Sequence, residues 1–379
     1  MIKKQPLISI IVPAYKNYKY IYENLDSILA QDYPNIEIIV TDDASDDFDK
    51  KAIEKYLKTK SGNNIKRFLV NQNPKNLGTV KNLNNAIKLS KGDYVTFLAA
   101  DDMLYNKHVF SKYINCFNSL PKKELIVVAQ VGMYDIKLKR LIQYFVSKEN
   151  QEKINKLPPK KLFGEMSSKC ILPGSSIFYK KELFKKYGYF DEKYKLVEDY
   201  SSALKFSRLG IKYNYFDFVS SKHRDGGISH GNKIGEVHKS KQYELDILNT
   251  FKNEVLPYKY LLNKQQKKEF LKKIKEQQWN YSYNFEFANS PKKQKQLFLK
   301  QNWKNGLSTF LNDFSIDLKD QLIGKKFKIF MVGIILMLNQ THIIRIIGLL
   351  LILISFILLI KFLFKKYIPR LFRLIKFIF

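Results

Sequence analysis

Short apolar segments alternate with amphipathic segments over the first hundred residues of the chain. The four apolar segments are rich in β-branched residues and have the length of buried strands. The three amphipathic segments between them repeat apolar residues at helical spacing. The predicted strands are Leu7–Pro13, Ile36–Thr41, Ile65–Asn71 and Tyr94–Ala99, and the predicted helices are Tyr20–Gln31, Asp49–Lys58 and Thr79–Leu89. This alternation predicts an α/β fold with a parallel sheet and right-handed crossovers.

The pattern changes twice further along the chain. A mixed region contains an apolar run at Leu125–Val131 and, later, a predicted strand followed by two helices. It gives way to a polar, Lys-rich helical stretch and then to a basic, strongly apolar one. We therefore predict an α/β domain at 1–235 with halves at 1–104 and 105–235, a helical extension at 236–324 and a membrane-associating segment at 325–379.

The last part of the chain has the composition of a membrane-binding segment. Residues 321–379 contain no Asp or Glu and ten Lys or Arg. The stretch Ile343–Phe364 has about the length needed to cross a bilayer, and the tail after it mixes bases with large apolar residues, as interfacial helices do. A single span, a hairpin that begins at Phe327–Leu338, a helix lying in the interface and a buried soluble helix are the alternatives.

The net charge of +31 suits nucleic acid, an anionic membrane surface or a phosphorylated ligand. No nucleic-acid-binding motif is found and the aromatic residues lie in apolar runs, so we predict no nucleic acid partner. Cys116 and Cys170 are isolated, which indicates reduced thiols or small core residues. The chain starts without an apolar leader, so we expect no signal peptide and predict that any membrane contact comes from a later segment.

Candidate ligand-binding residues follow three of the predicted strands directly. Pro13 ends the first strand and Tyr15 follows it, Asp43 follows the second, and the pair Asp101 and Asp102 follows the fourth. Ligands of parallel sheets bind at the carboxyl ends of the strands, and a carboxylate pair there can hold a divalent cation. The structural alternatives are ordinary packing for the tyrosine, and turns or helix caps for the acids.

Further candidates occur singly or in pairs. Lys81 follows the loop "NLG" and faces either a phosphate or solvent. Glu198 and Asp199 open a predicted helix, where a carboxylate serves as a general base or as a cap. His223 and Arg224 lie in "SKHRDGG", either in contact with a ligand or in a surface loop.

The order of these segments resembles the family-2 inverting glycosyltransferases, whose nucleotide-binding fold is called GT-A. "SIIVPAYKN", "IEIIVTDDASDD" and "NPKNLGTVKNLNNAIKLSKGDYVTFLAADD" are similar to the opening strand, the nucleoside-binding acid and the long block that ends in the metal-binding acidic motif. The resemblance covers about residues 6–231. One departure is Ala99, where the family usually has an acid two places before the pair.

The resemblance implies a role for each matching position. Asp102 would ligate Mg²⁺ or Mn²⁺, Asp199 would be the catalytic base, and Glu198, His223 and Arg224 have no assigned role. The residues implied to bind the nucleotide-sugar are Pro13, Tyr15 against the base, Asp43 on a base N–H, Lys81 at a phosphate and Asp101 near the ribose or diphosphate.

The predicted function is therefore sugar transfer. The donor would be a nucleoside diphosphate sugar, with uracil implied by the resemblance, and the acceptor a hydroxyl of a glycan or lipid-linked molecule in cell-surface polysaccharide synthesis. Because such a donor is cytosolic, we expect a cytosolic catalytic domain on the cytoplasmic face of the cell membrane. The alternative is a non-catalytic, membrane-associated protein that binds a nucleotide or an anionic surface. The first strand is followed by "PAYKNYKY" and not by GxGxxG, which argues against a dinucleotide-dependent oxidoreductase.

Overall fold

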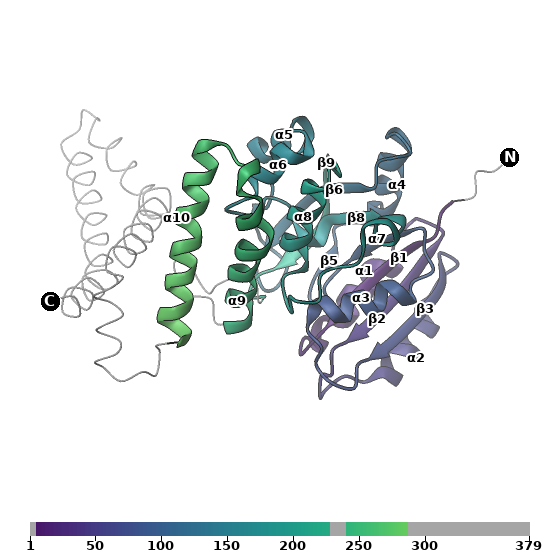
Figure 1. Cartoon of the computed structure of the whole chain (residues 1–379). Helices are drawn as coiled ribbons and strands as arrows, with labels where there is room; N and C mark the ends of the chain where they lie inside the picture. Colours follow the sequence, from purple (N-terminus) through teal and green to yellow (C-terminus); the bar gives the residue numbers. More distant parts are fainter. Residues whose placement is uncertain (1–4, 228–239, 287–379) are drawn as a thin grey trace, which may run out of the picture. The chain divides into compact units, whose positions relative to one another are not determined.

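The computed structural model of the chain describes residues 5–227 and 240–286 (Figure 1). One compact unit contains the described residues up to 227 together with 242–271, and residues 240–241 and 272–286 belong to a second unit. The predicted membrane-associating segment at 325–379, and the extension beyond residue 286, lie outside the described residues. Within the described part, no helix combines the length and the apolar character that a membrane span requires.

A single mixed sheet runs through the first unit, in the strand order β3-β2-β1-β4-β8-β6-β9-β5 with β7 paired to β6. The strands β1 to β4 are parallel, β8 is antiparallel to both β4 and β6, and β6 runs parallel to β9. The strands are β1 (Ile8–Ala14), β2 (Ile36–Asp42), β3 (Ile65–Gln72), β4 (Tyr94–Phe97), β5 (Met103–Leu104), β6 (Ile126–Tyr134), β7 (Leu141–Tyr144), β8 (Ile177–Lys180) and β9 (Tyr213–Arg224).

Helices lie on both faces of this sheet (Figure 1). The helix α10 belongs to the first unit only up to Leu271. The α-helices are α1 (Ile21–Leu29), α2 (Lys50–Lys60), α3 (Thr79–Leu89), α4 (Val109–Ser119), α5 (Lys148–Lys156), α6 (Pro159–Glu165), α7 (Glu182–Tyr187), α8 (Glu198–Arg208), α9 (Lys241–Thr250) and α10 (Lys264–Tyr281).

The predicted parallel α/β half is confirmed. The helix α3 has the predicted bounds, and the other helices and strands of the first hundred residues differ from the prediction by one or two residues at their ends. The regular strand β4 ends at Phe97, but the chain stays beside β1, because Leu98 donates to the Ile11 carbonyl and Ala100 to the Pro13 carbonyl. The apolar run at Leu125–Val131 forms most of β6.

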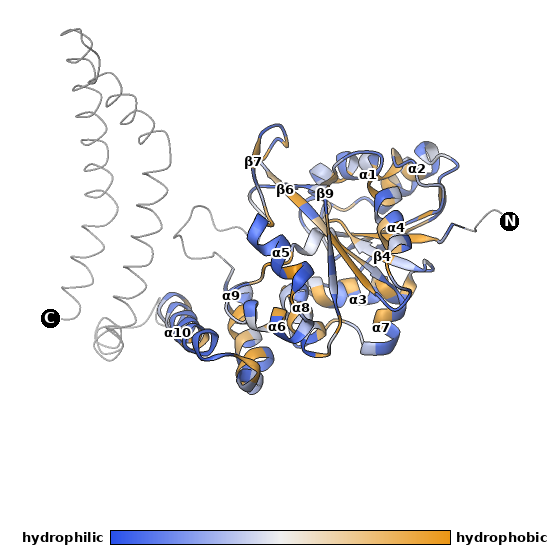
Figure 2. Cartoon of the chain, turned by 90° about the horizontal axis from the view of Figure 1, so that it is seen from above, coloured by the Kyte–Doolittle hydropathy of each residue, from blue (hydrophilic) through white to orange (hydrophobic). Residues whose placement is uncertain are grey.

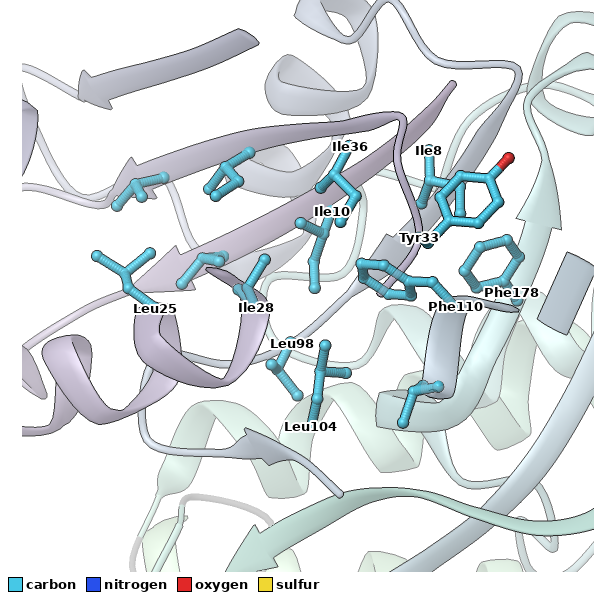
Figure 3. Packing of buried hydrophobic residues seen from close by; sticks show 14 of the residues in the cluster. Ile8, Ile10, Leu25, Ile28, Tyr33, Ile36, Leu98, Leu104, Phe110 and Phe178 are labelled. Carbon is cyan, nitrogen blue, oxygen red and sulfur yellow. The ribbon is translucent and has the colours of Figure 1, made fainter. Parts of the chain in front are cut away.

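The main core lies between one face of the sheet and the helices α1, α2 and α4. Leu25 and Ile28 of α1 pack toward Ile10 of β1 and Ile36 of β2, and Phe178 of β8 closes the same cluster (Figure 3). Burying one such aliphatic side chain contributes about 1.5–3 kcal/mol. The rows of Ile and Val along the strands therefore stabilise the platform from which the strand ends project.

The opposite face is covered by α3 and α7. Phe184 of α7 contacts Tyr179 of β8 with 5.3 Å between ring centroids, and Phe97 of β4 lies 5.8 Å from the same tyrosine ring. Hydrophobic residues accordingly lie along the strands and on the sides of the helices that point toward the sheet (Figure 2). Both cysteines are free thiols, Cys116 buried and Cys170 partly buried, in agreement with the prediction.

Candidate functional site

Three strand ends meet at the carboxyl edge of the sheet. Ala14 pairs with Asp42 in the parallel register, and the N–H of Asp43 donates to the Ala14 carbonyl over 2.9 Å. The N–H of Ala100, just after β4, donates to the Pro13 carbonyl over 3.1 Å. The predicted convergence of these strand ends is therefore confirmed.

Tyr15 is presented at this edge with 40% of its surface exposed. The chain turns immediately after it, because Lys16 has a positive φ of 54° and its N–H donates to the Ser45 hydroxyl over 2.8 Å. Ser45 is fixed in turn by Asp42, to which its hydroxyl donates over 2.6 Å. The tyrosine ring is thus held on a rigid turn with area left for a planar ligand.

Asp43 is buried and organises the loop before α3. One carboxylate oxygen accepts the N–H of Leu77 over 2.8 Å and the side-chain amide of Asn73 over 3.0 Å, and the other accepts the N–H of Gly78 over 2.8 Å. A carboxylate has about four lone-pair sites. Three are used by the loop, which leaves one for a ligand such as a base N–H.

Asp102 is only 1% exposed and connects the end of β4 to the end of β9. One of its oxygens accepts the N–H of Arg224 over 3.0 Å, and the other lies 2.7 Å from Nδ1 of His223. Burial works to lower the pKa of His223, but the charge and hydrogen bond of Asp102 keep it above the ordinary value. His223, whose role was left open, therefore lies against the predicted metal ligand.

Asp101 is partly buried and accepts the side-chain amide of Asn17 over 3.3 Å. Burial, followed by the charge of Asp102, raises the pKa of its carboxyl group. In the two described ranges, no group of three or more His, Cys, Asp or Glu side chains is placed to hold a metal ion. Any cation bound here would therefore need ligands from another source, such as phosphates.

Arg224, which also had no assigned role, is buried, and each of its three guanidinium nitrogens donates a hydrogen bond within the protein. Nε donates to the Asp101 carbonyl over 2.8 Å, Nη1 to the Ile136 carbonyl over 2.6 Å, and Nη2 to Glu23 over 2.8 Å. The guanidinium also lies 3.8 Å from the centre of the Tyr20 ring. Arg224 therefore clamps the acidic pair to α1 and to the loop after β6.

Asp199 lies in the first turn of α8, where its carboxylate accepts the N–H of Tyr200 over 2.7 Å. The side chain packs directly on Gly174, since a Cβ at that position would lie 2.7 Å from Oδ2 of Asp199. Gly174 precedes β8, which is antiparallel to β4, so the start of β8 lies at the carboxyl edge of β4. The structure thus brings Asp199 to the same edge as Asp101 and Asp102.

Burial raises the pKa of both carboxyl groups that open α8. The pKa of Glu198 rises to about 8, by burial and then by the charge of Asp199, and burial likewise raises the pKa of Asp199. A carboxylate with a raised pKa is a stronger base, as general base catalysis at neutral pH requires. Adjacent carboxyl groups of this kind are typical of functional sites.

This raised pKa predicts how stability changes with pH. The pKa of Glu198 is higher in the folded protein than its ordinary value of 4.5, so the protonated side chain stabilises the fold. This contribution is complete below about pH 4.5. The contribution is lost as the pH rises through about 8. We expect the Glu198→Gln variant to gain thermal stability relative to wild type between pH 5 and pH 9. A difference in Tm between the variant and wild type that stays constant from pH 5 to pH 9 would contradict the assignment.

Lys81, in the first turn of α3, is half exposed, and its ammonium lies 3.9 Å from Glu192. An exposed pair at this distance contributes little to stability. The side chain therefore remains available to an anionic ligand.

Asp246 of α9 is a residue that the sequence interpretation missed. It is fully buried, and Oδ2 accepts the N–H groups of Lys195 and Leu196 over 2.8 Å and 2.7 Å. The carbonyl of Lys195 accepts the N–H of Val80 over 3.1 Å. Asp246 thus fixes the segment that leads into α8, and the only sequence signal is a carboxylate within the apolar stretch of a helix.

We expect Asp246→Ala to lower the free energy of unfolding by about 2–4 kcal/mol, because two part-buried N–H groups lose a charged and fully buried acceptor. Any activity that depends on Asp199 should fall even where the variant is fully folded, since the segment before Asp199 loses its support. Denaturant unfolding and kcat at a temperature well below Tm measure the two effects. Glu152→Ala, an exposed carboxylate on α5, is the matched control and should change neither.

The sequence was compared with protein families and with curated proteins. A model of the family described as "Glycosyl transferase family 2" matches residues 9–188. An uncharacterised glycosyltransferase of Rickettsia typhi is 36% identical over 208 residues, which cover 55% of this chain and 61% of that protein. An uncharacterised glycosyltransferase of Haemophilus influenzae is 27% identical over 248 residues, covering 63% and 70%. The chain therefore spans less than two thirds of the Rickettsia relative.

The fold was also compared with solved structures. The crystal structure of Staphylococcus aureus TarS matches with a TM-score of 0.50 and 19% sequence identity, over 80% of this chain and 54% of that one. At this identity the likeness concerns the fold alone. The mixed sheet described above is therefore a GT-A-type α/β sheet, as the sequence predicted.

Proposed function

We propose that the protein transfers a sugar from a nucleoside diphosphate donor to a hydroxyl group of an acceptor, because residues 9–188 match the model of glycosyltransferase family 2 and the chain is similar to curated glycosyltransferases. The observation that carries the proposal is the position of Asp199 at the sheet edge that also holds Asp101 and Asp102. A base and a carboxylate pair at one edge suit a reaction with two departures. The acceptor hydroxyl loses its proton on one side of the sugar, and the diphosphate leaves on the other.

The donor would occupy the edge between β1, β2 and β4. The exposed ring of Tyr15 offers a stacking surface for a nucleobase, and the remaining acceptor site on Asp43 suits a base N–H, as in uracil. Lys81 is available for a phosphate. UDP is accordingly the nucleotide that we propose first.

A divalent cation, Mg²⁺ or Mn²⁺, fits the acidic pair by chemistry. Carboxylates are hard oxygen ligands, and each oxygen of Asp102 accepts a single hydrogen bond from the protein and keeps a lone pair. Asp102, with Asp101 beside it, would hold the ion, and donor phosphates would complete its ligands. Bound there, the cation would supply electrostatic stabilisation of the leaving diphosphate. Asp102 is covered by protein atoms, so its neighbours must shift for the ion to reach it.

The chain's own residues account for the proton and for the geometry. Asp199 accepts the proton of the acceptor hydroxyl, whose oxygen then forms the new bond to the anomeric carbon as the bond to the diphosphate oxygen breaks. Attack from the face opposite the leaving group inverts the anomeric configuration. Gly174 and the N–H of Tyr200 hold the carboxylate of Asp199 in one orientation, which favours this alignment.

We propose a glycan or a lipid-linked molecule as the acceptor, in cell-surface polysaccharide synthesis at the cytoplasmic face of the cell membrane. The support is the net charge of +31 and the basic, apolar composition of residues 325–379, which suit an anionic lipid surface. No nucleic acid partner is proposed.

A screen of nucleotide sugars with membranes that contain the full chain tests this function. Transfer of labelled sugar into a lipid-extractable or glycan product, abolished by EDTA and restored by Mn²⁺ or Mg²⁺, is the expected result. Nucleotide binding without transfer from any donor would favour the alternative, a non-catalytic nucleotide-binding protein. Transfer that is insensitive to EDTA would retain the enzyme and remove the cation from its mechanism.

A further inference from the structure

The hairpin formed by β6 and β7 exposes apolar residues that the proposed reaction does not use. All five residues of the run Leu141–Phe145, "LIQYF", are exposed, and Ile136 before it is exposed as well. Single exposed apolar residues are common on protein surfaces, but a contiguous group of this kind marks an interaction site. The hairpin projects from the sheet, with hydrophobic and hydrophilic residues side by side (Figure 2).

The tip of the hairpin is well ordered by its own hydrogen bonds. The carboxylate of Asp135 accepts the N–H groups of Lys139 and Arg140 over 2.8 Å and 3.3 Å. Its backbone N–H donates to the Arg140 carbonyl over 3.0 Å, and its carbonyl accepts the N–H of Leu138 over 2.9 Å. A preformed tip costs little conformational entropy when a partner binds.

The charge of the tip is strongly positive. Lys137, Lys139 and Arg140 are exposed within four residues. The acid of the tip, Asp135, is engaged by the backbone amides described above. A tip with basic side chains beside exposed Ile, Leu, Tyr and Phe side chains is complementary to a surface with an anionic outer layer and an apolar layer below it.

Among the described residues both faces of β7 are exposed, whereas β6 is buried along nearly its whole length. Tyr144 and Phe145 are successive residues and the ladder continues past β7, since the N–H of Phe145 donates to the Val131 carbonyl over 3.0 Å. Successive residues of a strand point to opposite faces. A folded protein docked on one face would leave the other in water, whereas the interfacial region of a bilayer surrounds both.

We infer that the exposed part of the β6–β7 hairpin, its tip at Ile136–Arg140 with β7 and the flanking Phe145, docks the first unit on an anionic lipid bilayer, with its exposed apolar side chains in the interfacial region and its bases among the headgroups. The hairpin is joined to the acidic pair through Arg224, which donates to the carbonyls of both Ile136 and Asp101. If the proposed function holds, docking would set the transfer site at the height of lipid-carried acceptors.

The test must separate the hairpin from residues 325–379, which are also predicted to bind membranes. We therefore propose a local probe in the full chain. The environment-sensitive fluorophore NBD is attached to Ile142→Cys, in a background with Cys116→Ala and Cys170→Ala. The same probe at Leu209→Cys is the matched control, because Leu209 is 50% exposed and Ile142 is 51% exposed. Both labelled proteins are titrated with phosphatidylglycerol–phosphatidylcholine vesicles and with pure phosphatidylcholine vesicles.

We expect a blue shift and a several-fold rise in emission at position 142 with the anionic vesicles, a weak response with neutral vesicles, and no change at position 209. Replacing Lys139 and Arg140 with Gln should weaken the response about five-fold per charge. Unfolding curves of each variant establish that it is folded. The measurement does not depend on sugar transfer, so it stands apart from the test of the proposed function.

Two results would overturn the inference. One is an unchanged signal at position 142, whether or not the protein cosediments with the vesicles. The other is a signal that rises with protein concentration alone, which would identify a second copy of the chain as the occupant of the hairpin.

Discussion

Replacing Asp199 with Asn is expected to reduce sugar transfer by about 10²–10⁴-fold, because the acceptor hydroxyl loses the base that takes its proton. Asparagine has the same shape and still accepts the N–H of Tyr200, so the start of α8 should keep its structure. Donor binding should be unchanged, since no contact that we assign to the nucleotide involves this residue. Initial rates of transfer and calorimetric titration with the donor measure the two quantities.

The matched control is Asp217→Asn, which removes an exposed carboxylate paired with Lys148 and should retain wild-type rates. A variant at Asp199 that keeps more than about a tenth of the wild-type rate would remove it from the role of base. In that case Glu198, the neighbouring residue in the first turn of α8, would be examined next.

Replacing Asp102 with Asn is expected to lower transfer by about 10²–10³-fold, the usual cost of losing one electrostatic stabiliser of a developing charge. Donor affinity should also stop responding to Mn²⁺. The free energy of unfolding should fall by about 1–3 kcal/mol, because the amide cannot satisfy both His223 and the N–H of Arg224 as the carboxylate does. Donor titrations with and without Mn²⁺, together with denaturant unfolding, measure these effects.

A second carboxylate–histidine pair provides the control. Asp32 contacts Nδ1 of His108 and accepts the Ser111 hydroxyl over 2.6 Å, and it lies before β2, at the amino end of the strand. Asp32→Asn should lower the free energy of unfolding without changing how donor affinity responds to Mn²⁺. If Asp102→Asn behaves in the same way, Asp102 is a structural clamp and the cation has other ligands.

The strands and helices of the first hundred residues could be predicted because their information is local. Rows of Ile and Val predict buried strands, and the parallel crossovers bring Pro13, Asp43 and Asp101 to one edge whatever their side chains do. The sequence was also sufficient for the helix that opens at Glu198. Each of these features depends on spacing within a short segment.

Other parts of the site depend on contacts between distant segments. The parallel pairing of β6 with β9 and the burial of Arg224 against Tyr20 arise from tertiary packing, which hydrophobic periodicity does not encode. The same holds for Asp246, whose partners Lys195 and Leu196 lie about fifty positions earlier in the chain. The engagement of both Asp102 oxygens could likewise be seen only once β9 was placed.

The hydrogen bonds around Gly78 join two parts of the site that are far apart in the sequence. Asp43 holds the amide of Gly78, the following turn bonds to the Lys195 carbonyl through Val80, and Asp246 holds the amide of Lys195. At Gly78, where φ is +86°, a Cβ would lie 2.8 Å from that same carbonyl oxygen. Amides linked in this manner exchange their hydrogens through a shared opening event. The loop that Asp43 holds and the segment that leads to Asp199 therefore form one cooperative unit, and loosening either end loosens both.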